Sequence, residues 1–139
     1  MIRYMLDTNA CIGVINDNSL SLRRRLQQVE PTEVAISEIV RHELAFGVCN
    51  SKQVGKNQAA LTHFLKYVQV LAWEEAQSAA AAQIRCELAR KGQPIGHYDT
   101  LIAAHARSLQ VTLITHNTRE FGRVDDLRVE DWVSVADNE

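Results

Sequence analysis

Three carboxylic acids stand in sequence contexts that are mainly apolar or that begin a helix. Asp7 ends a short apolar strand, Glu43 lies on the apolar stripe of a helix, and Asp99 falls in the first turn of another helix. Taken singly, each has a structural explanation: a helix N-cap, a glutamate at the edge of a stripe, and a partner for a helix dipole. A carboxylate on a core-facing stripe is nevertheless unusual, because burying it unpaired costs free energy.

We expect the three carboxylates to converge at one edge of the fold, where their charges would repel and their protonation would be coupled. A divalent cation neutralises such a cluster. An all-oxygen ligand set without thiolates or several imidazoles favours Mg²⁺ or Mn²⁺ over Zn²⁺. Two such ions about 3.5–4 Å apart support in-line displacement at phosphorus, and one ion still positions water and offsets phosphate charge. The residue types therefore indicate metal-assisted chemistry at phosphorus.

The hydrophobic periodicity predicts the elements that position these acids. Predicted strands cover residues 2–6, 33–36, 68–72, 111–115 and 128–133. Predicted helices cover residues 9–15, 19–29, 38–48, 58–67, 74–91 and 97–109, with a polar loop expected over 49–57. Strands alternating with helices predict an α/β fold with a mostly parallel central sheet of about five strands and helices on both faces. Residues 137–139 are expected to fray.

Parallel sheets of this kind bind ligands beyond the carboxyl ends of their strands. This rule directs attention to Asp7, Ser37 and the turn 115–117, because each directly follows a predicted strand. It also brings the helices that carry Glu43 and Asp99 towards the same edge. The fold therefore supplies the reason to expect the acids together.

The composition excludes several other classes of protein. The chain has 139 residues, a formal net charge of −2 and 46% hydrophobic residues, which suits a single domain over residues 1–139. Its three cysteines form no C-x-x-C pair, so neither a zinc ribbon nor a disulfide framework is expected. No apolar run is long enough to span a bilayer, and residues 1–6 lack the features of a signal peptide. We therefore expect a cytoplasmic protein that does not insert into membranes.

Four motifs together resemble a known family. The segment MLDTN (5–9) resembles the opening motif of PIN domains, and RHELAFG (41–47) resembles the segment E-L-x-x-G with their second acid. The segment GQPIGHYD (92–99), followed by Ile102 and Ala103, is similar to the G-x-P-I-G-x-x-D-x-x-I-A motif of VapC-type toxins. The segment THNTREF (115–121) resembles the T-N-N-x-x-E-F segment of an enterobacterial-like VapC subgroup. The order and spacing of the motifs match over essentially the whole chain.

This resemblance implies a PIN-like three-layer α/β/α fold and a toxin of a type II toxin–antitoxin (VapBC) pair. Members of the family are Mg²⁺- or Mn²⁺-dependent endoribonucleases that act on structured RNA, often tRNA, and leave a 5′-phosphate and a 3′-hydroxyl. Initiator tRNA, cut in its anticodon stem–loop, is the substrate that the subgroup implies, with inhibited translation as the result. The implied partners are a VapB-type antitoxin, which would hold the assembly on operator DNA, and a second copy of the chain. Asp7, Glu43 and Asp99 would be the catalytic metal ligands.

One position departs from the PIN pattern. The fourth acidic position falls on Asn117, whose neutral oxygen adds no charge to a second metal site, so one-metal catalysis is favoured. Glu120, three residues on, is a candidate to replace the missing charge. Thr115 either hydrogen-bonds a metal-bound water or caps the next turn. The opening motif adds Thr8 and Asn9 as supporting residues.

Basic and aromatic side chains are candidate RNA contacts. These residues are Arg23, Arg24 and Arg25 in one run, Arg85 on a predicted helix, and His97 and Tyr98 beside the third acid. Several arginines together would bind phosphates, and the two rings would stack on a base or sugar. The structural alternatives are a solvated helix face for the charge run and a loop role for the rings. An apolar surface within residues 61–68 is expected to mediate self-association.

Three other functions remain open on the residues alone. A metal-dependent DNA nuclease uses a similar acidic cluster, but the chain lacks the length for a region that clamps a duplex. A receiver-type signalling domain needs an acidic pair after its first strand and a late lysine, whereas Thr8 follows Asp7 and no lysine follows Lys91. A catalytically silent RNA- or partner-binding module is compatible with Asn117. Activity and its metal dependence discriminate among these functions.

Overall fold

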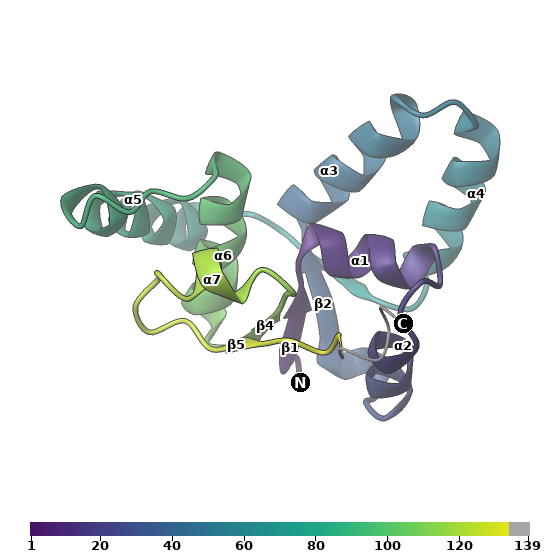
Figure 1. The fold of residues 1–139 in the computed structure, drawn as a ribbon, viewed down its shortest axis with the longest axis horizontal. Helices are drawn as coiled ribbons and strands as arrows, with labels where there is room; N and C mark the ends of the chain where they lie inside the picture. Colours follow the sequence, from purple (N-terminus) through teal and green to yellow (C-terminus); the bar gives the residue numbers. More distant parts are fainter. Residues whose placement is uncertain (134–139) are drawn as a thin grey trace.

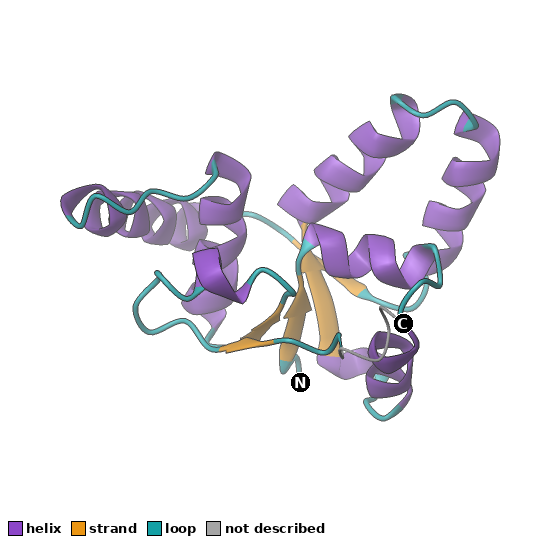
Figure 2. Ribbon diagram, in the orientation of Figure 1, coloured by secondary structure: helices purple, strands orange, loops and turns teal. Residues whose placement is uncertain are grey.

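A five-stranded parallel sheet forms the centre of the molecule (Figures 1 and 2). The computed structural model describes residues 1–133, and the expected fraying of 137–139 lies outside the described residues. The strands are β1 (Tyr4–Leu6), β2 (Val34–Ser37), β3 (Gln69–Leu71), β4 (Thr112–Ile114) and β5 (Val129–Glu130). Their order is β3-β2-β1-β4-β5, and all four neighbouring pairs are parallel. The predicted parallel sheet is confirmed.

Helices cover the sheet in the three-layer arrangement that was expected. They are α1 (Thr8–Ile15), α2 (Leu20–Gln27), α3 (Glu38–Cys49), α4 (Val54–Phe64), α5 (Glu75–Arg90), α6 (His97–Leu109) and α7 (Thr118–Phe121), with a 3₁₀ turn, η1 (Pro31–Glu33). Figure 1 shows α1, α3 and α4 grouped to the right of the strands and α5, α6 and α7 grouped to the left. Between residues 1 and 133, no helix is long and apolar enough to cross a membrane.

The central strand β1 and its neighbours β2 and β4 are buried because helices cover both faces of the sheet. The side chains of Met5, Leu6, Ile36 and Leu113 are wholly inaccessible to solvent. From the helical side, Ile102 fills the same core. Burial of this apolar surface fixes the register of β1 against β2 and β4, and with it the edge at which the strands end.

Three sequence expectations were wrong in detail. Helix α4 begins at Val54 rather than at residue 58, because the supposed loop already makes the helical hydrogen bond from Asn57 N to Gln53 O (2.9 Å). The last strand is only Val129–Glu130, because Trp132 turns inward and packs edge-on against Tyr4 with ring centroids 5.0 Å apart. Helix α7 was not expected at all, since four residues carry no readable periodicity.

The loop between α5 and α6 is held in a defined conformation. Helix α5 ends at Arg90 with Lys91 as its C-cap, and Gly92 follows with a positive φ of 67° that glycine tolerates without strain. Arg123 donates from Nη1 to the carbonyl oxygen of Pro94 (3.1 Å), and Lys91 pairs with Asp125 (2.8 Å). These contacts tie the loop to the segment after α7, and thereby fix where α6 begins.

Candidate active site

Asp7 lies at the carboxyl end of β1, and only 4% of its surface is exposed. Its Oδ1 accepts a hydrogen bond from Ala10 N (2.8 Å), so the residue is the N-cap of α1. The Thr115 hydroxyl also hydrogen-bonds this carboxylate. Burial raises the pKa of Asp7 above its usual range, and the nearby charge of Glu43 raises it further, against the lowering effect of the two hydrogen bonds. The structural interpretation of Asp7 as an N-cap is confirmed, and its catalytic role stays a prediction.

Glu43 reaches this site from α3 and is half-buried. Its Oε1 accepts a hydrogen bond of 2.6 Å from the Thr8 hydroxyl at the start of α1. An ion pair with Arg41 was the structural alternative for this glutamate, but Arg41 instead pairs with Glu38 (3.0 Å). The charge of Glu43 is therefore left for the site, and Thr8 sets its direction.

Asp99 enters from the first turn of α6. Burial is the largest cause that raises its pKa to about 6, followed by the negative charges of Asp7, Glu120 and Glu43. Among residues 1–133, no side chain donates a hydrogen bond to its carboxylate. Mutual repulsion of this kind arises only where carboxylates lie close together in a partly dry environment.

The turn after β4 brings in a fourth carboxylate. Asn117 Nδ2 donates to Glu120 Oε2 (3.2 Å), so the amide at the expected acidic position orients a glutamate three residues on. Thr115 Oγ1 accepts from Asn117 N (2.9 Å), which is the predicted turn cap, while its own hydroxyl contacts Asp7. The negative charge of Glu120 is also one cause of the raised pKa of Asp99, so this glutamate lies within electrostatic reach of the cluster.

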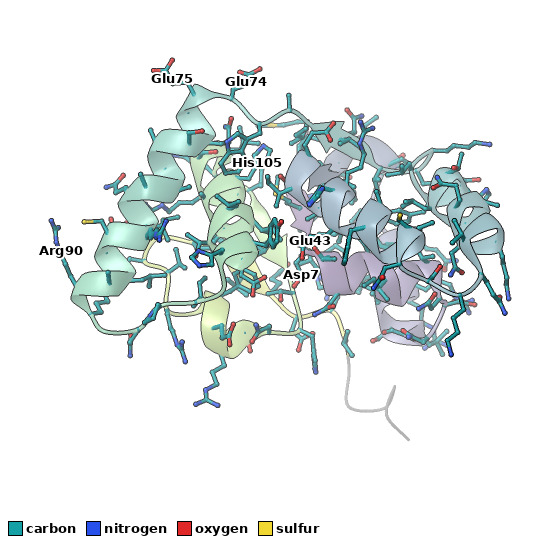
Figure 3. The ribbon with its side chains drawn as sticks, turned by 90° about the horizontal axis from the view of Figure 1, so that it is seen from above. Asp7, Glu43, Glu74, Glu75, Arg90 and His105 are labelled. Atoms are coloured by element: carbon teal, nitrogen blue, oxygen red, sulfur yellow. The ribbon has the colours of Figure 1, made fainter. Side chains whose placement is uncertain are left out.

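Four elements thus direct acidic side chains towards one region, and Figure 3 shows Asp7 and Glu43 next to each other there. Within residues 1–133, no three acidic, histidine or cysteine side chains form a finished set of metal ligands, and no lysine or arginine forms an ion pair with the four acids. The donors nevertheless fit a hard divalent cation. All are oxygens, and Asp99 and Glu43 Oε2 carry acceptor positions to which no described donor is bound.

The predicted basic run does not act as one unit. Arg23 forms a two-pronged pair with Asp17 (3.0 and 2.9 Å), so its charge is compensated on the surface. Arg24 is exposed, and the Arg25 guanidinium lies 4.8 Å from the ring centroid of Trp132. Arg85 is exposed on α5 and makes no contact with the acids. The run therefore splits into one paired arginine and two that no carboxylate in residues 1–133 engages.

Tyr98 belongs to an aromatic pair that the sequence did not suggest. Its hydroxyl lies 3.4 Å from His42 Nε2, and the two rings are 5.8 Å apart. The pair joins α6 to α3, with each member next in sequence to one of the acids, Asp99 and Glu43. Tyr98 is 47% exposed, and His97 is exposed beside it. Nothing in the spacing signals His42, because residues 42 and 98 meet only through the contact between their helices.

Ser37, named by the strand-end rule, and Asn9, named by the opening motif, differ in what they do. Ser37 caps α3 by accepting from Ile39 N (3.0 Å), and its hydroxyl lies 2.7 Å from His105 Nδ1. Its polar atom is therefore used within the core. Asn9 is exposed in the first turn of α1 and lines a cavity beside the acids. The expected self-association surface is also altered, because Leu61 and Phe64 are buried in the core.

A parallel sheet with this acidic cluster at its carboxyl edge is the arrangement of the PIN-domain family, and the chain belongs to that family, whose sequence model matches residues 4–127. Its relatives within the family are VapC proteins. A tRNA(fMet)-specific endonuclease VapC of Shigella flexneri is 41% identical over 132 residues, which are 95% of this chain and 99% of the relative. Ribonuclease VapC2 of Rickettsia felis is 38% identical, over 93% of this chain and 97% of its own length.

Solved structures agree with these sequence relatives. The crystal structure of DNA-bound VapBC from Salmonella typhimurium matches with a TM-score of 0.91 and 39% identity, covering 95% of this chain and 99% of the other. VapBC2 from Rickettsia felis, bound to a DNA fragment from its promoter, matches with a TM-score of 0.89 and 38% identity over the same shares. The expected PIN-like fold and the VapC resemblance are thereby confirmed.

Proposed function

We propose that this chain is the toxin of a VapBC pair, an Mg²⁺- or Mn²⁺-dependent endoribonuclease that cleaves tRNA and so inhibits translation. The observation that carries the proposal is the convergence of Asp7, Glu43, Asp99 and Glu120 at the carboxyl edge of the sheet. Folding brings them together although their charges repel, which costs stability unless a cation binds. A cluster retained at such a cost is typical of a functional site.

Asp7, Glu43 and Asp99 would hold the cation. When bound, a divalent ion lowers the pKa of water and offsets negative charge on the phosphate. The chain's own part is to fix the ligands. Thr115 orients Asp7 through its hydroxyl, and Thr8 orients Glu43 through a 2.6 Å bond. Such outer partners strengthen a metal site by removing conformational freedom from its ligands.

Glu120 and Asn117 complete the acidic edge in a different way from a fourth aspartate. The hydrogen bond of 3.2 Å from Asn117 Nδ2 to Glu120 Oε2 fixes the glutamate side chain in the first turn of α7. Its charge contributes to the raised pKa of Asp99, so it lies within electrostatic reach of the third ligand. We propose that Glu120 sits in the outer part of the site, and that one cation rather than two is held tightly.

Initiator tRNA, cut in the anticodon stem–loop, is the substrate that we propose. The support is the relative from Shigella flexneri, a tRNA(fMet)-specific endonuclease VapC, which is 41% identical over nearly the full chain. The partners that we propose are a VapB-type antitoxin and a second copy of the chain. The VapBC complexes of the structural relatives, two of them bound to DNA, support an assembly held on operator DNA through the antitoxin. This reading makes the protein cytoplasmic.

Cleavage of bacterial tRNA by the purified, antitoxin-free protein tests the proposal. Reactions with Mg²⁺, with Mn²⁺ and with EDTA are compared, for the wild type and for Asp99→Asn, and the 5′ ends of the products are mapped. We expect discrete cuts in the initiator anticodon stem–loop, with 5′-phosphate ends, that need the metal and the carboxylate. Asp125→Asn is the matched control, since that aspartate pairs with Lys91 outside the cluster.

Each other outcome has a definite meaning. Cuts in a different RNA would keep the nuclease and replace the substrate. A folded protein that binds RNA and cleaves none would support the silent binding module. Activity that survives both EDTA and Asp99→Asn would overturn the assignment of the acids, because a metal-free mechanism needs neither.

A further inference from the structure

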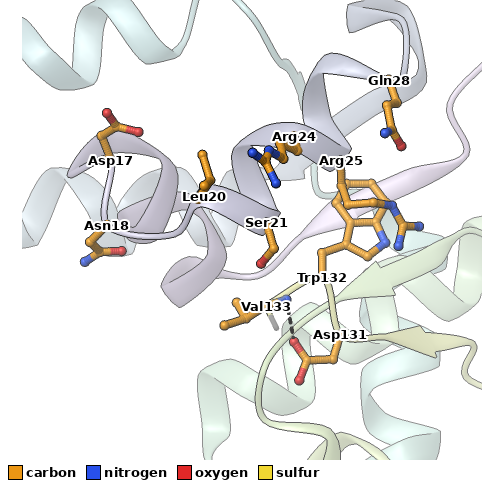
Figure 4. A pocket seen from close by; sticks show the side chains of 10 residues that line it. All are labelled: Asp17, Asn18, Leu20, Ser21, Arg24, Arg25, Gln28, Asp131, Trp132 and Val133. Atoms are coloured by element: carbon orange, nitrogen blue, oxygen red, sulfur yellow. Dashed lines mark hydrogen bonds between the residues drawn. The ribbon is translucent and has the colours of Figure 1, made fainter. Parts of the chain in front are cut away.

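Two adjacent cavities form a groove along α1 and α2, beginning beside Thr115 and Asn117, which hydrogen-bond two of the acids. Its inner part, a cavity of about 630 Å³, is lined by Asn9, Thr115 and Asn117. The Thr115 side chain hydrogen-bonds Asp7, and the Asn117 side chain hydrogen-bonds Glu120. Its outer part, of about 690 Å³, is lined by Arg24, Arg25 and Gln28 of α2 (Figure 4). Asn18 and the segment 131–133 line both parts, so the two cavities lie next to each other.

The outer end of the groove carries arginine side chains that form no ion pair within residues 1–133. Arg23, one position earlier on α2, is neutralised by Asp17, whereas Arg24 and Arg25 form no ion pair with any carboxylate of residues 1–133. Asp131, which also lines the groove, pairs with His116 (2.9 Å). Asp17 and Asp131, the carboxylates of residues 1–133 that line the groove, are therefore already engaged, and two guanidinium groups remain for an anionic ligand.

Arg25 is also held in place. Its guanidinium lies 4.8 Å from the ring centroid of Trp132, and that tryptophan is only 3% exposed. Stacking on a fixed ring restricts the side chain while leaving its N–H groups free at the edges of the plane. Figure 4 shows Arg25 over Trp132, with Arg24 at the preceding position of the same helix. A pre-ordered guanidinium loses little conformational entropy when it binds a phosphate.

We propose that this groove binds the single-stranded part of the RNA next to the scissile bond, with Arg24 and Arg25 on its backbone phosphates. The inference rests on the proposed ribonuclease function, and it adds a direction: the strand leaves the acids along α1 and passes between α2 and the segment 131–133. RNA fits because its phosphates match the arginines and its bases and hydroxyls match the polar lining around Asn18. The run of three arginines thus divides into two that bind RNA and one that does not.

Fluorescence anisotropy tests the groove without any need for cleavage. The protein carries Asp99→Asn, the probes are a fluorescein-labelled initiator anticodon stem–loop and a labelled oligouridylate, and the salt concentration is varied. We expect Arg24→Gln with Arg25→Gln to weaken binding at least 10-fold and to lower the slope of log K against log salt by about 1.4, because each lost phosphate contact on a single strand removes about 0.7. Arg23→Gln, the matched control, should stay within twofold.

Two further variants protect the test against misfolding. Arg24→Gln alone changes an exposed side chain with no described partner, so it should fold normally and lose about half of the salt effect. Arg24→Lys should restore most of the affinity. In the wild-type background, the double variant should raise KM for tRNA with kcat within twofold.

The proposal fails if the double variant and Arg23→Gln bind RNA alike. It also fails if RNA binding is unchanged while binding of the cognate antitoxin is lost, which would assign the groove to a protein partner. Absence of cleavage by the wild type would count against the ribonuclease alone, because the anisotropy measurement decides the groove by itself.

Discussion

Replacement of Asp99 by asparagine should stabilise the metal-free protein while abolishing its activity. The carboxylate is desolvated and faces the charges of Asp7, Glu120 and Glu43, and its pKa is raised to about 6. In the unfolded chain the same group has a pKa near 3.8. The ionised form is therefore less favourable in the folded state, and asparagine removes that charge with little change of shape.

The size of the effect follows from this difference in pKa. A shift of about 2 units corresponds to about 3 kcal/mol at most. Asp99 is partly exposed, so solvent screening reduces the expected gain to about 1–1.5 kcal/mol. For a chain of this length, that gain raises Tm by about 3–5 °C.

The gain must also depend on pH in one direction. Because the folded pKa lies above the unfolded pKa, the penalty is absent below pH 3.8 and complete above pH 6. At pH 4.5 about a third of the gain should remain. Mg²⁺ should reverse the order of stability at pH 7.5, because it binds the folded wild type and not the variant.

Urea unfolding of the wild type, Asp99→Asn and Asp125→Asn at several pH values, in EDTA and in Mg²⁺, measures these quantities. The control should lie within about 0.5 kcal/mol of the wild type, since an exposed ion pair contributes little. If Asp99→Asn is less stable than the wild type in EDTA at pH 7.5, or if its gain does not change with pH, the acids do not repel one another as described.

Three further predictions concern single side chains. Thr8→Val should lower kcat/KM about 10-fold and raise the Mg²⁺ concentration needed for half-maximal cleavage, because Glu43 loses its 2.6 Å bond; Thr8→Ser should retain the activity, and a Thr8→Val enzyme that behaves as the wild type would remove the positioning role. Tyr98→Ala should raise KM for tRNA about 5- to 30-fold by loss of base stacking while Tyr98→Phe retains it, measured as initial cleavage rates, and equal losses in both variants would contradict stacking. His105 is 1% exposed, and burial lowers its pKa to about 4. The stability that the neutral imidazole provides is therefore complete above pH 6.5 and is lost as the pH falls towards 4. His105→Gln should reduce the fall in unfolding free energy between pH 6.5 and pH 4 by up to about 3 kcal/mol, and an unchanged fall in denaturant titrations would refute this.

Much of the fold can be predicted from the sequence because local patterns determine where the strands and helices form. The short apolar run before Asp7, the opening acids of α5 and the glycine at its end give strand, helix start and helix stop without reference to the rest of the chain. Alternation of such elements then leaves a parallel sheet as the arrangement that buries both faces. Errors arose where tertiary packing overrides local signals, as at Trp132, which turns into the core instead of extending β5.

By itself, the sequence determines which acids are candidates for one shared chemistry. Residue type, position on predicted elements and motif spacing single out Asp7, Glu43 and Asp99. The tertiary structure alone decided how they are held: by Thr8 across two helices, and by Thr115 across two strands. It also decided that Glu120 lies within electrostatic reach of Asp99 and accepts a hydrogen bond from Asn117.

The arginine run shows the same division. Three consecutive arginines are equivalent in the sequence, and no local rule separates them. In the folded chain they point in different directions around α2, so Asp17 neutralises Arg23 while Trp132 stacks on Arg25. The residue type sets the sign of the charge, but the neighbouring side chains decide whether that charge is paired or can bind a ligand. Those neighbours come from distant parts of the chain and meet only when the core is formed.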